Sequence, residues 1–238
     1  MSDFPAVMNH GSIEEVFPDV FFVTGTMRNE FFGSMWQFGR NMVVVREQGK
    51  LSLIGAVRLD DAGLEALDAL GKVTNVVRIG SMHGHDDAFY VDRYSATYWA
   101  MPGMPGDGGP KVDKELSVGG ELPFGDASLF EFKCIKIPEC IIRLDREGGI
   151  LISCDALQNW EAPDPFTDDE TIATMTKMGF YTRGGVGPAW AHVNEPKPDD
   201  FVRLKEVSYK HALCGHGSPL LHTAREDFHA TFARMFDL

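Results

Sequence analysis

Apolar residues fall into short runs separated by turn residues along most of the chain. Runs of this length, bounded by Gly, Pro, Asn or Asp, are typical of strands. They predict strands at Val20–Val23, Met42–Arg46, Leu51–Ala56, Val76–Ile79, Leu129–Ile137, Cys140–Leu144 and Gly149–Ser153. Turn residues at Gln48-Gly49 join Met42–Arg46 to Leu51–Ala56 as a hairpin. Those at positions 145–148 join Cys140–Leu144 to Gly149–Ser153 in the same way.

Three segments have helical patterns, at Asp60–Leu70, from Thr167 to Gly179, and from Thr223 toward the C-terminus. The first repeats leucine every three residues and stops at Gly71. The other two open on Thr-x-x-Glu, a capping box in which each side chain satisfies the other's backbone amide. On the last helix an apolar stripe predicts core packing, formed by Phe228, Phe232 and Met235.

Strands interspersed with helices predict an α/β chain, and no repeat or composition shift divides it. We therefore expect one domain over residues 1–238, a length that α/β sandwiches commonly reach. Gly and Pro are dense in Met101–Gly125, which predicts a long irregular loop. Such a loop is either a surface excursion or a lid over a site.

The formal net charge of −13 argues against partners with a phosphate backbone, which would need clustered Lys and Arg. We therefore expect no nucleic acid as partner. We also expect no membrane as partner, because no apolar run approaches the roughly 20 residues that span a bilayer. The N-terminus has no secretory pattern, and the four cysteines show no CxxC pairing. We expect buried structural thiols, a cytoplasmic location and a small-molecule partner, and leave a homo-oligomer open.

One segment carries candidate chemistry, His83-Gly84-His85-Asp86-Asp87. Two histidines at i and i+2 in a loop after a strand can face one point, and a carboxylate two residues later can reach a second. Zn²⁺ and Fe²⁺ accept imidazole and carboxylate ligands. The alternative is a loop whose histidines are solvated or hydrogen-bonded.

Two later positions strengthen the metal interpretation. Asp155 follows the apolar run that starts at Gly149, and functional side chains collect at strand ends in α/β folds. Its alternative role is to cap the following turn. His216 lies between Gly215 and Gly217, which permit backbone conformations that turn the imidazole inward.

In their order and spacing these residues resemble the metallo-β-lactamase superfamily, whose first motif is His-x-His-x-Asp-His. The resemblance implies the four-layer αβ/βα sandwich of that superfamily, an α/β (α+β) fold. It also implies a metal site, with ligands His83, His85, Asp155 and His216. Asp87 is then either a further ligand or the catalytic base that orients water.

The chain departs from this pattern at two positions. Ala88 stands where the first motif ends in His, and Ile135–Cys140 has no histidine where the superfamily has one. Glu139 is either a substitute oxygen ligand or a surface residue after Pro138. We therefore expect at most one tightly held divalent ion per chain, Zn or Fe.

The resemblance implies hydrolysis of a small ester, thioester, lactone or phosphoester by metal-activated water. Two alternatives stay open: a binding or interaction module that kept the fold with a degenerate site, and redox chemistry at a single iron. The glycine-rich segment 183–188 lacks the Lys of a phosphate loop, so a flexible turn is expected there. The four tryptophans are expected in the core or at its rim, with Asn159 and Trp160 at the mouth of the site.

Overall fold

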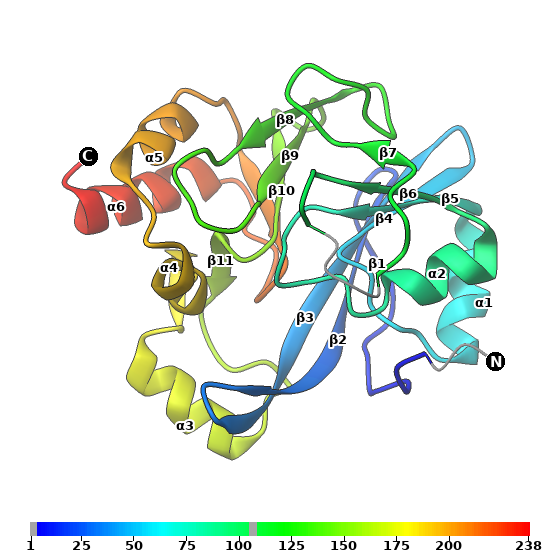
Figure 1. Ribbon diagram of the computed structural model, residues 1–238, viewed down its shortest axis with the longest axis horizontal. Helices are drawn as coiled ribbons and strands as arrows, with labels where there is room; N and C mark the ends of the chain where they lie inside the picture. Colours follow the sequence, from blue (N-terminus) through cyan, green and yellow to red (C-terminus); the bar gives the residue numbers. More distant parts are fainter. Residues whose placement is uncertain (1–3, 105–108) are drawn as a thin grey trace.

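The computed structural model describes residues 4–104 and 109–238. Two sheets pack face to face, with helices on both outer sides (Figure 1). The strands are β1 (Glu14–Phe17), β2 (Val20–Phe31), β3 (Ser34–Glu47), β4 (Lys50–Ile54), β5 (Lys72–Arg78), β6 (Thr97–Ala100), β7 (Lys114–Glu115), β8 (Ala127–Glu131), β9 (Cys140–Leu144), β10 (Ile150–Ser153), β11 (Leu157–Trp160), β12 (Thr182–Val186) and β13 (His211–Cys214). The helices are α1 (Asp61–Leu70), α2 (Asp87–Tyr94), α3 (Asp169–Met178), α4 (Pro188–Asn194), α5 (Pro198–Lys205) and α6 (Ala224–Phe236).

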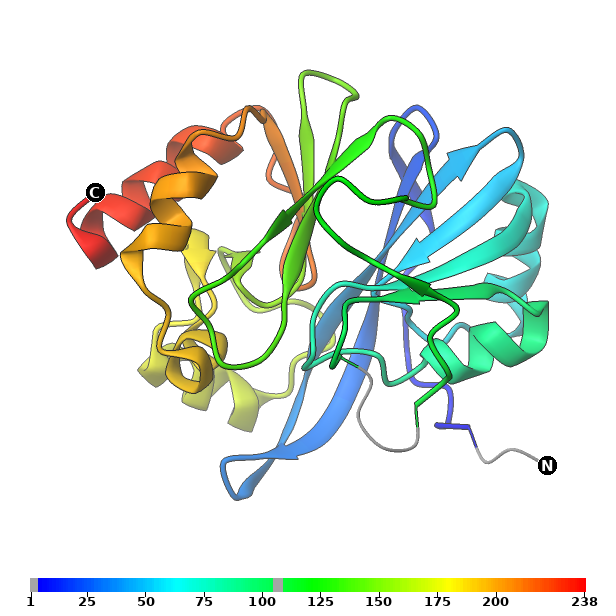
Figure 2. The ribbon, with the colours of Figure 1, turned by 45° about the horizontal axis from the view of Figure 1, so that its top comes forward.

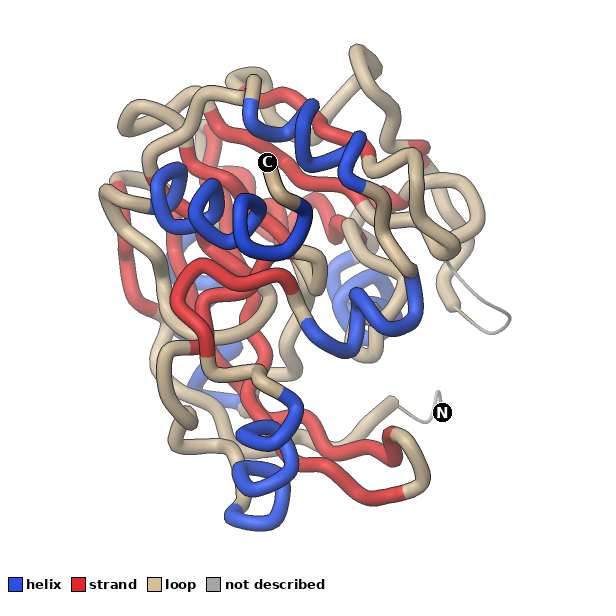
Figure 3. Tube along the Cα trace, turned by 90° about the vertical axis from the view of Figure 1, so that its left-hand side faces the viewer, coloured by secondary structure: helices blue, strands red, loops and turns tan. Residues whose placement is uncertain are grey.

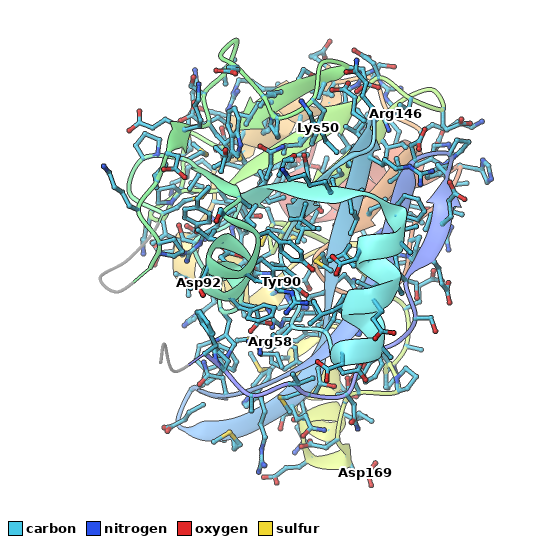
Figure 4. The ribbon with its side chains drawn as sticks, turned by 90° about the vertical axis from the view of Figure 1, so that its right-hand side faces the viewer. Lys50, Arg58, Tyr90, Asp92, Arg146 and Asp169 are labelled. Carbon is cyan, nitrogen blue, oxygen red and sulfur yellow. The ribbon has the colours of Figure 1, made fainter. Side chains whose placement is uncertain are left out.

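The first sheet follows chain order from β1 to β7. Its pairs are antiparallel as far as β4 and parallel from there on. Parallel neighbours need a crossover, which α1 provides between β4 and β5 and α2 between β5 and β6. Both helices lie on the outer face of this sheet (Figure 4). There the Tyr90 hydroxyl donates to the Val57 carbonyl and accepts from the Leu59 amide, which ties α2 to the segment before α1.

The second sheet has the order β13-β10-β9-β8, in which β10 and β13 are parallel. Helices α5 and α6 cover its outer side (Figures 1 and 3). Because strand side chains alternate, β10 sends Ile152 to the core between the sheets and Leu151 toward α6. Phe228 and Phe232 of α6 are fully buried against that side. The expected four-layer αβ/βα sandwich is confirmed.

Local sequence patterns predicted several elements correctly. The β3–β4 and β9–β10 hairpins form as expected, β9 has the predicted bounds, and Asp60 caps α1 by accepting from the Gly63 amide. All four cysteines are free. None of the helices in the described ranges combines the length and the apolar character that crossing a bilayer requires.

The strand predicted at Leu129–Ile137 is too long, because β8 ends at Glu131. Beyond it, the buried Asp200 carboxylate accepts from the backbone amides of Lys133 and Cys134. The Asn194 side-chain oxygen then accepts from the amides of Lys136 and Ile137. Side chains of α4 and α5 thus take the backbone donors that a strand partner would have used.

The two predicted capping boxes are wrong in detail. Asp168, and not Thr167, caps α3 by accepting from the Thr171 amide. Thr223 stands at the start of α6, but its hydroxyl donates to the Asp227 side chain and makes no capping bond. Met235 is 46% exposed, so it does not belong to the packed stripe of α6, and Phe236 packs against the core cluster instead.

The glycine-rich segment predicted as a flexible turn is strand β12 followed by the start of α4. It pairs with β11 in a small antiparallel sheet. The segment predicted as a long loop does run irregularly between the two sheets, with β7 as its one short strand among the described residues (Figure 2). Positions 105–108 of that prediction lie outside the described residues.

Candidate metal centre

The first motif lies in the loop that follows β5. Arg78, at the end of β5, donates from Nε to the Gly80 carbonyl and from Nη2 to the Ser81 carbonyl. The chain then wraps around the guanidinium at Gly84, which has φ +102°, and a Cβ there would lie 2.7 Å from Arg78 Cζ. This tight wrap fixes where His83 points, and only glycine fits at the bend.

Three predicted residues converge although they are far apart in the chain. His83 Nε2 lies 3.1 Å from His216 Nε2 and 3.3 Å from Asp155 Oδ2. His216 Nε2 lies 3.1 Å from Asp155 Oδ1. The side chains are 5–9% exposed. Because β10 and β13 are parallel neighbours, their carboxyl ends bring Asp155 and His216 to the same edge of the sheet.

The tautomer of His216 is set by a backbone carbonyl. Its Nδ1 lies 2.9 Å from the Gly39 oxygen, and a carbonyl oxygen can only accept, so Nδ1 carries the proton. The lone pair of neutral His216 is therefore on Nε2 and faces His83 and Asp155. The indole of Trp160 stacks on the imidazole, with ring centroids 5.1 Å apart and planes 12° from parallel.

Asp164 stabilises the two groups that contact His216, the backbone at Gly39 and the indole of Trp160. Its carboxylate accepts from the Gly39 amide at 3.2 Å and from Trp160 Nε1 at 3.1 Å. A Cβ on Gly39 would lie 2.5 Å from Asp164 Oδ2, so a larger residue would displace the carboxylate. The residues that orient His216 are thus themselves fixed, as second partners of ligating histidines commonly are.

Two carboxyls near the centre have opposite pKa shifts. Burial alone would raise the pKa of Asp155, but the electrostatic attraction of His83 and the polar contacts with His83 and His216 outweigh it, and the pKa lies well below the usual range. For Glu139, burial and then the Asp155 charge raise the pKa well above its usual range. Asp155 is therefore ionised at neutral pH and is the stronger acid of these two close carboxyls.

The donor set fits a divalent transition metal. Two imidazole nitrogens and a carboxylate suit Zn²⁺ or Fe²⁺. Ligands at about 2.0–2.1 Å from a tetrahedral ion lie about 3.3 Å from one another, close to the observed 3.1–3.3 Å. The unprotonated His216 Nε2 faces a second imidazole nitrogen, and a cation between them satisfies both.

A cysteine missed by the sequence reasoning adjoins this group. Cys154 has one ligand atom within 4.8 Å of those of His83 and Asp155, and its Sγ lies 3.3 Å from Asp155 Oδ2. Burial, then the charges of Asp155 and Glu139, raise its pKa well above the usual range, so it is a thiol here. Its position directly before the strand-end Asp155 is the only sequence feature that singles it out.

Two further residues of the predicted site, His85 and Asp87, lie outside the group of three converging side chains. His85 is exposed and borders a separate hollow with Arg28, Arg40 and Arg58. Asp87 is 1% exposed, and its Oδ2 accepts from the Tyr98 hydroxyl at 2.9 Å.

Glu139 is 1% exposed and not a surface residue, so that alternative is wrong. Its Oε1 accepts from the Ala156 amide at 2.6 Å. The Glu139 side chain therefore supports the backbone that follows Asp155.

A pocket of about 570 Å³, partly open to solvent, lies over the three converging side chains. Most of its lining is apolar and comes from the β2–β3 hairpin, α3 and β11. Trp36 and Trp160 both line it, as does Gln158. A second hollow beside it is bordered by His83, His85 and, from the long loop, Gly109 and Pro110. That loop therefore approaches the candidate centre.

No protein-family model and no curated protein matches the chain. Among solved structures, it is similar to the DIM-1 metallo-β-lactamase, with TM-score 0.59 and 12% identity over 98% of this chain and 99% of that one. The metallo-β-lactamase from Erythrobacter litoralis gives TM-score 0.58 and 12% identity over 97% and 96%. The metallo-β-lactamase from Hirschia baltica gives a TM-score of 0.59 and 10% identity, over 93% of this chain and 98% of that one. The chain has the metallo-β-lactamase fold.

Proposed function

We propose that this protein is a metal-dependent hydrolase of the metallo-β-lactamase superfamily that acts on a small ester, thioester, lactone or phosphoester. The observation that carries the proposal is the convergence of His83, Asp155 and His216 at the floor of a pocket. A pocket with a few convergent polar groups on an apolar lining is the usual form of a small-molecule site.

In this proposal His83, Asp155 and His216 hold one divalent ion, Zn or Fe. Such an ion supplies a water whose pKa is lowered to roughly 7 and polarises the oxygen of the scissile group. The protein's own contribution is orientation. The Gly39 carbonyl keeps the His216 lone pair on Nε2, and ionised Asp155 supplies the negative charge.

Asp87 is the proposed catalytic base, while the exposed His85 and the Glu139 that accepts from the Ala156 amide are left out of the proposed ligand set. Asp87 Oδ1 has no hydrogen-bond partner among the described residues, so one carboxylate oxygen is free to accept a proton. Asp87→Asn keeps the size of the side chain and an oxygen for the Tyr98 hydroxyl. If Asp87 is the base, this variant keeps its metal and loses about 10²–10⁴-fold in turnover.

The test of the function is paired metal analysis and turnover. Protein is purified without chelators or an affinity-tag metal, analysed for bound elements, and assayed on ester, thioester, lactone and phosphoester panels. We expect about one equivalent of Zn or Fe and hydrolysis that is lost on metal removal and restored by its return.

Two results would replace the proposal. A folded, metal-free protein that hydrolyses nothing on the panels, with or without added metal, indicates a binding module that kept the fold. Iron together with oxygen-dependent turnover, and no hydrolysis, indicates redox chemistry.

A further inference from the structure

Part of the pocket wall is a hairpin extension that leaves the main sheet. Strands β2 and β3 pair with each other from Val20 to Phe31, whereas β4 pairs only with the stretch of β3 from Val43 to Glu47. From Met27 to Phe38 the hairpin is therefore a two-stranded ribbon within the sheet. Figure 2 shows it extending away from the body of the molecule.

The inner side of this ribbon is aromatic. Trp36 and Phe38 pack with Trp160 and Phe180 in a cluster separate from the core between the sheets. Phe32, at the tip, is 57% exposed, and it lines the pocket. A two-stranded ribbon is marginal by itself, so its order depends on these contacts.

The ribbon is also anchored by hydrogen bonds. The Gln37 amide donates to Thr171 Oγ1 on α3 at 2.9 Å, and the Gln37 carbonyl accepts from the Asp168 amide. The Asp164 carboxylate accepts from the Gly39 amide, so β3 of the wall is anchored at both Gln37 and Gly39. A preformed wall avoids the entropy cost of ordering a loop when a ligand binds.

The lining provides no cation for an anionic ligand. Among the described residues that border this pocket, the polar side chains are His83, Asp155, Gln158 and His216, and none is Lys or Arg. The nearby Arg28, Arg40 and Arg58 line a different hollow, where Arg40 pairs with Asp86. Arg78 borders the second hollow beside the pocket, and its guanidinium donates to the Gly80 and Ser81 carbonyls. A carboxylate or phosphate in the aromatic pocket would lose its hydration without gaining a partner from the chain.

We propose that the substrate is a neutral acyl compound, an uncharged ester, thioester or lactone whose apolar acyl group fills this aromatic pocket. The inference rests on the proposed hydrolase function and narrows it by excluding phosphoesters and acyl groups with a free carboxylate. Water adds to the acyl carbon, the C–O or C–S bond breaks, and the products are a carboxylic acid and an alcohol or thiol.

The first test compares kcat/KM for p-nitrophenyl acetate, butanoate and hexanoate. Each methylene that enters the pocket should raise kcat/KM about three- to fourfold, or about 10²-fold from acetate to hexanoate. The p-nitrophenyl monoester of adipic acid has a similar length and a terminal carboxylate, and should fall at least tenfold below the hexanoate. Bis(p-nitrophenyl) phosphate should be the poorest substrate. A flat series, or a preference for the phosphate, would overturn the proposal.

A matched pair of variants connects the preference to the pocket. Phe32→Ala removes an exposed side chain from the wall, so it should fold normally and reduce the hexanoate-to-acetate ratio at least threefold. Val118→Ala removes an equally exposed apolar side chain, 59% exposed, away from the lining and should leave the ratio unchanged. Equal ratios in both variants would contradict the assignment of the acyl group to this pocket.

Direct binding separates this inference from the hydrolase proposal. Chelator-treated protein is titrated with uncharged 2-nonanone and with nonanoate, read by tryptophan fluorescence, because Trp36 and Trp160 line the pocket. We expect the ketone to bind at least tenfold more tightly. Ketone binding in a protein without hydrolase activity would refute the hydrolase and leave the apolar specificity standing. Nonanoate binding as tightly as the ketone, or no binding of either, would refute the specificity even in an active hydrolase.

Discussion

The two ends of the segment that follows β5 both carry ionisable side chains, but these lie in different environments. At one end His83 faces His216 and Asp155, so two imidazole nitrogens and a carboxylate meet without a cation of the chain between them. At the other end each carboxylate has a partner, since Asp86 pairs with Arg40 and Asp87 accepts from Tyr98. One short motif thus contributes to the candidate metal centre at one end and to the support of the fold at the other.

The difference lies in the partners of each end. The His83 side chain faces two other ionisable side chains at a pocket whose described lining has no Lys or Arg, whereas Arg40 and Tyr98 face the two carboxylates of the other end. The His83 end, which we call the open end, is the proposed metal site. The Asp86 and Asp87 end, the closed end, holds the loop against β3 and β6 through Arg40 and Tyr98. Variants at the open end should change metal content, and variants at the closed end should change stability.

The largest expected effect is on metal content at the open end. His83→Ala and His216→Ala each remove one of three converging ligands, and two ligands leave a weakly chelating site. We expect bound metal, measured by elemental analysis after dialysis, to fall at least tenfold in both. Both variants should remain folded by circular dichroism. Full metal retention in either variant would show that its histidine is not a ligand.

At the closed end the largest effect is on the free energy of unfolding. Asp86→Ala leaves Arg40, which is 4% exposed, without its buried partner, and breaking such a pair costs about 3–5 kcal/mol. Chemical denaturation measures this loss. Asp92→Ala, on the exposed side of α2, is the matched control and should change stability by less than about 0.5 kcal/mol. Equal stability of the two variants would contradict a supporting role for Asp86.

A smaller effect is expected for Tyr98→Phe. It removes the hydroxyl that donates to Asp87 and leaves a buried carboxylate oxygen without its hydrogen bond, at a cost of about 1–3 kcal/mol. Metal content should stay at the wild-type level, because Tyr98 does not contact the three converging side chains. A combined loss of metal and stability would show that the two ends are coupled.

The smallest effect is expected for His85→Ala. His85 is exposed at the edge of the closed end and away from the pocket lining, so its removal should change stability by less than about 0.5 kcal/mol. Metal affinity from competition with a chelator should change less than threefold. A loss as large as that of His83→Ala would establish His85 as the fourth ligand and would require the loop to move when metal binds.

Local patterns in the sequence predicted the parts of the fold that local interactions determine. The turn residues at Gln48 and Gly49 and the leucine repeat of α1 are complete within a few residues. The full length of the β2–β3 ribbon was not predictable in this way. Arg28 and Arg40 interrupt its apolar pattern, because one lies exposed beyond the sheet and the other pairs with a residue 46 positions away.

The same limit applies to the site. The resemblance carried by the order of His83, Asp155 and His216 predicted their convergence, and the parallel pairing of β10 with β13 brings Asp155 and His216 to one edge of a sheet. The sequence could not show that Asp87 would meet Tyr98, or that Glu139 would be buried against the amide of Ala156. Those contacts depend on how loops pack, and no periodicity records them.

The most direct test of the account is the position of the metal itself. Crystals of the protein loaded with Zn²⁺ or Fe²⁺ are measured at the absorption edge of the metal, and the anomalous difference map locates the ion. The account predicts one strong peak at about 2.0–2.2 Å from His83 Nε2, His216 Nε2 and an Asp155 oxygen. A peak bound by His85 and Asp87 instead, or no peak among the three side chains in metal-loaded protein, would contradict it.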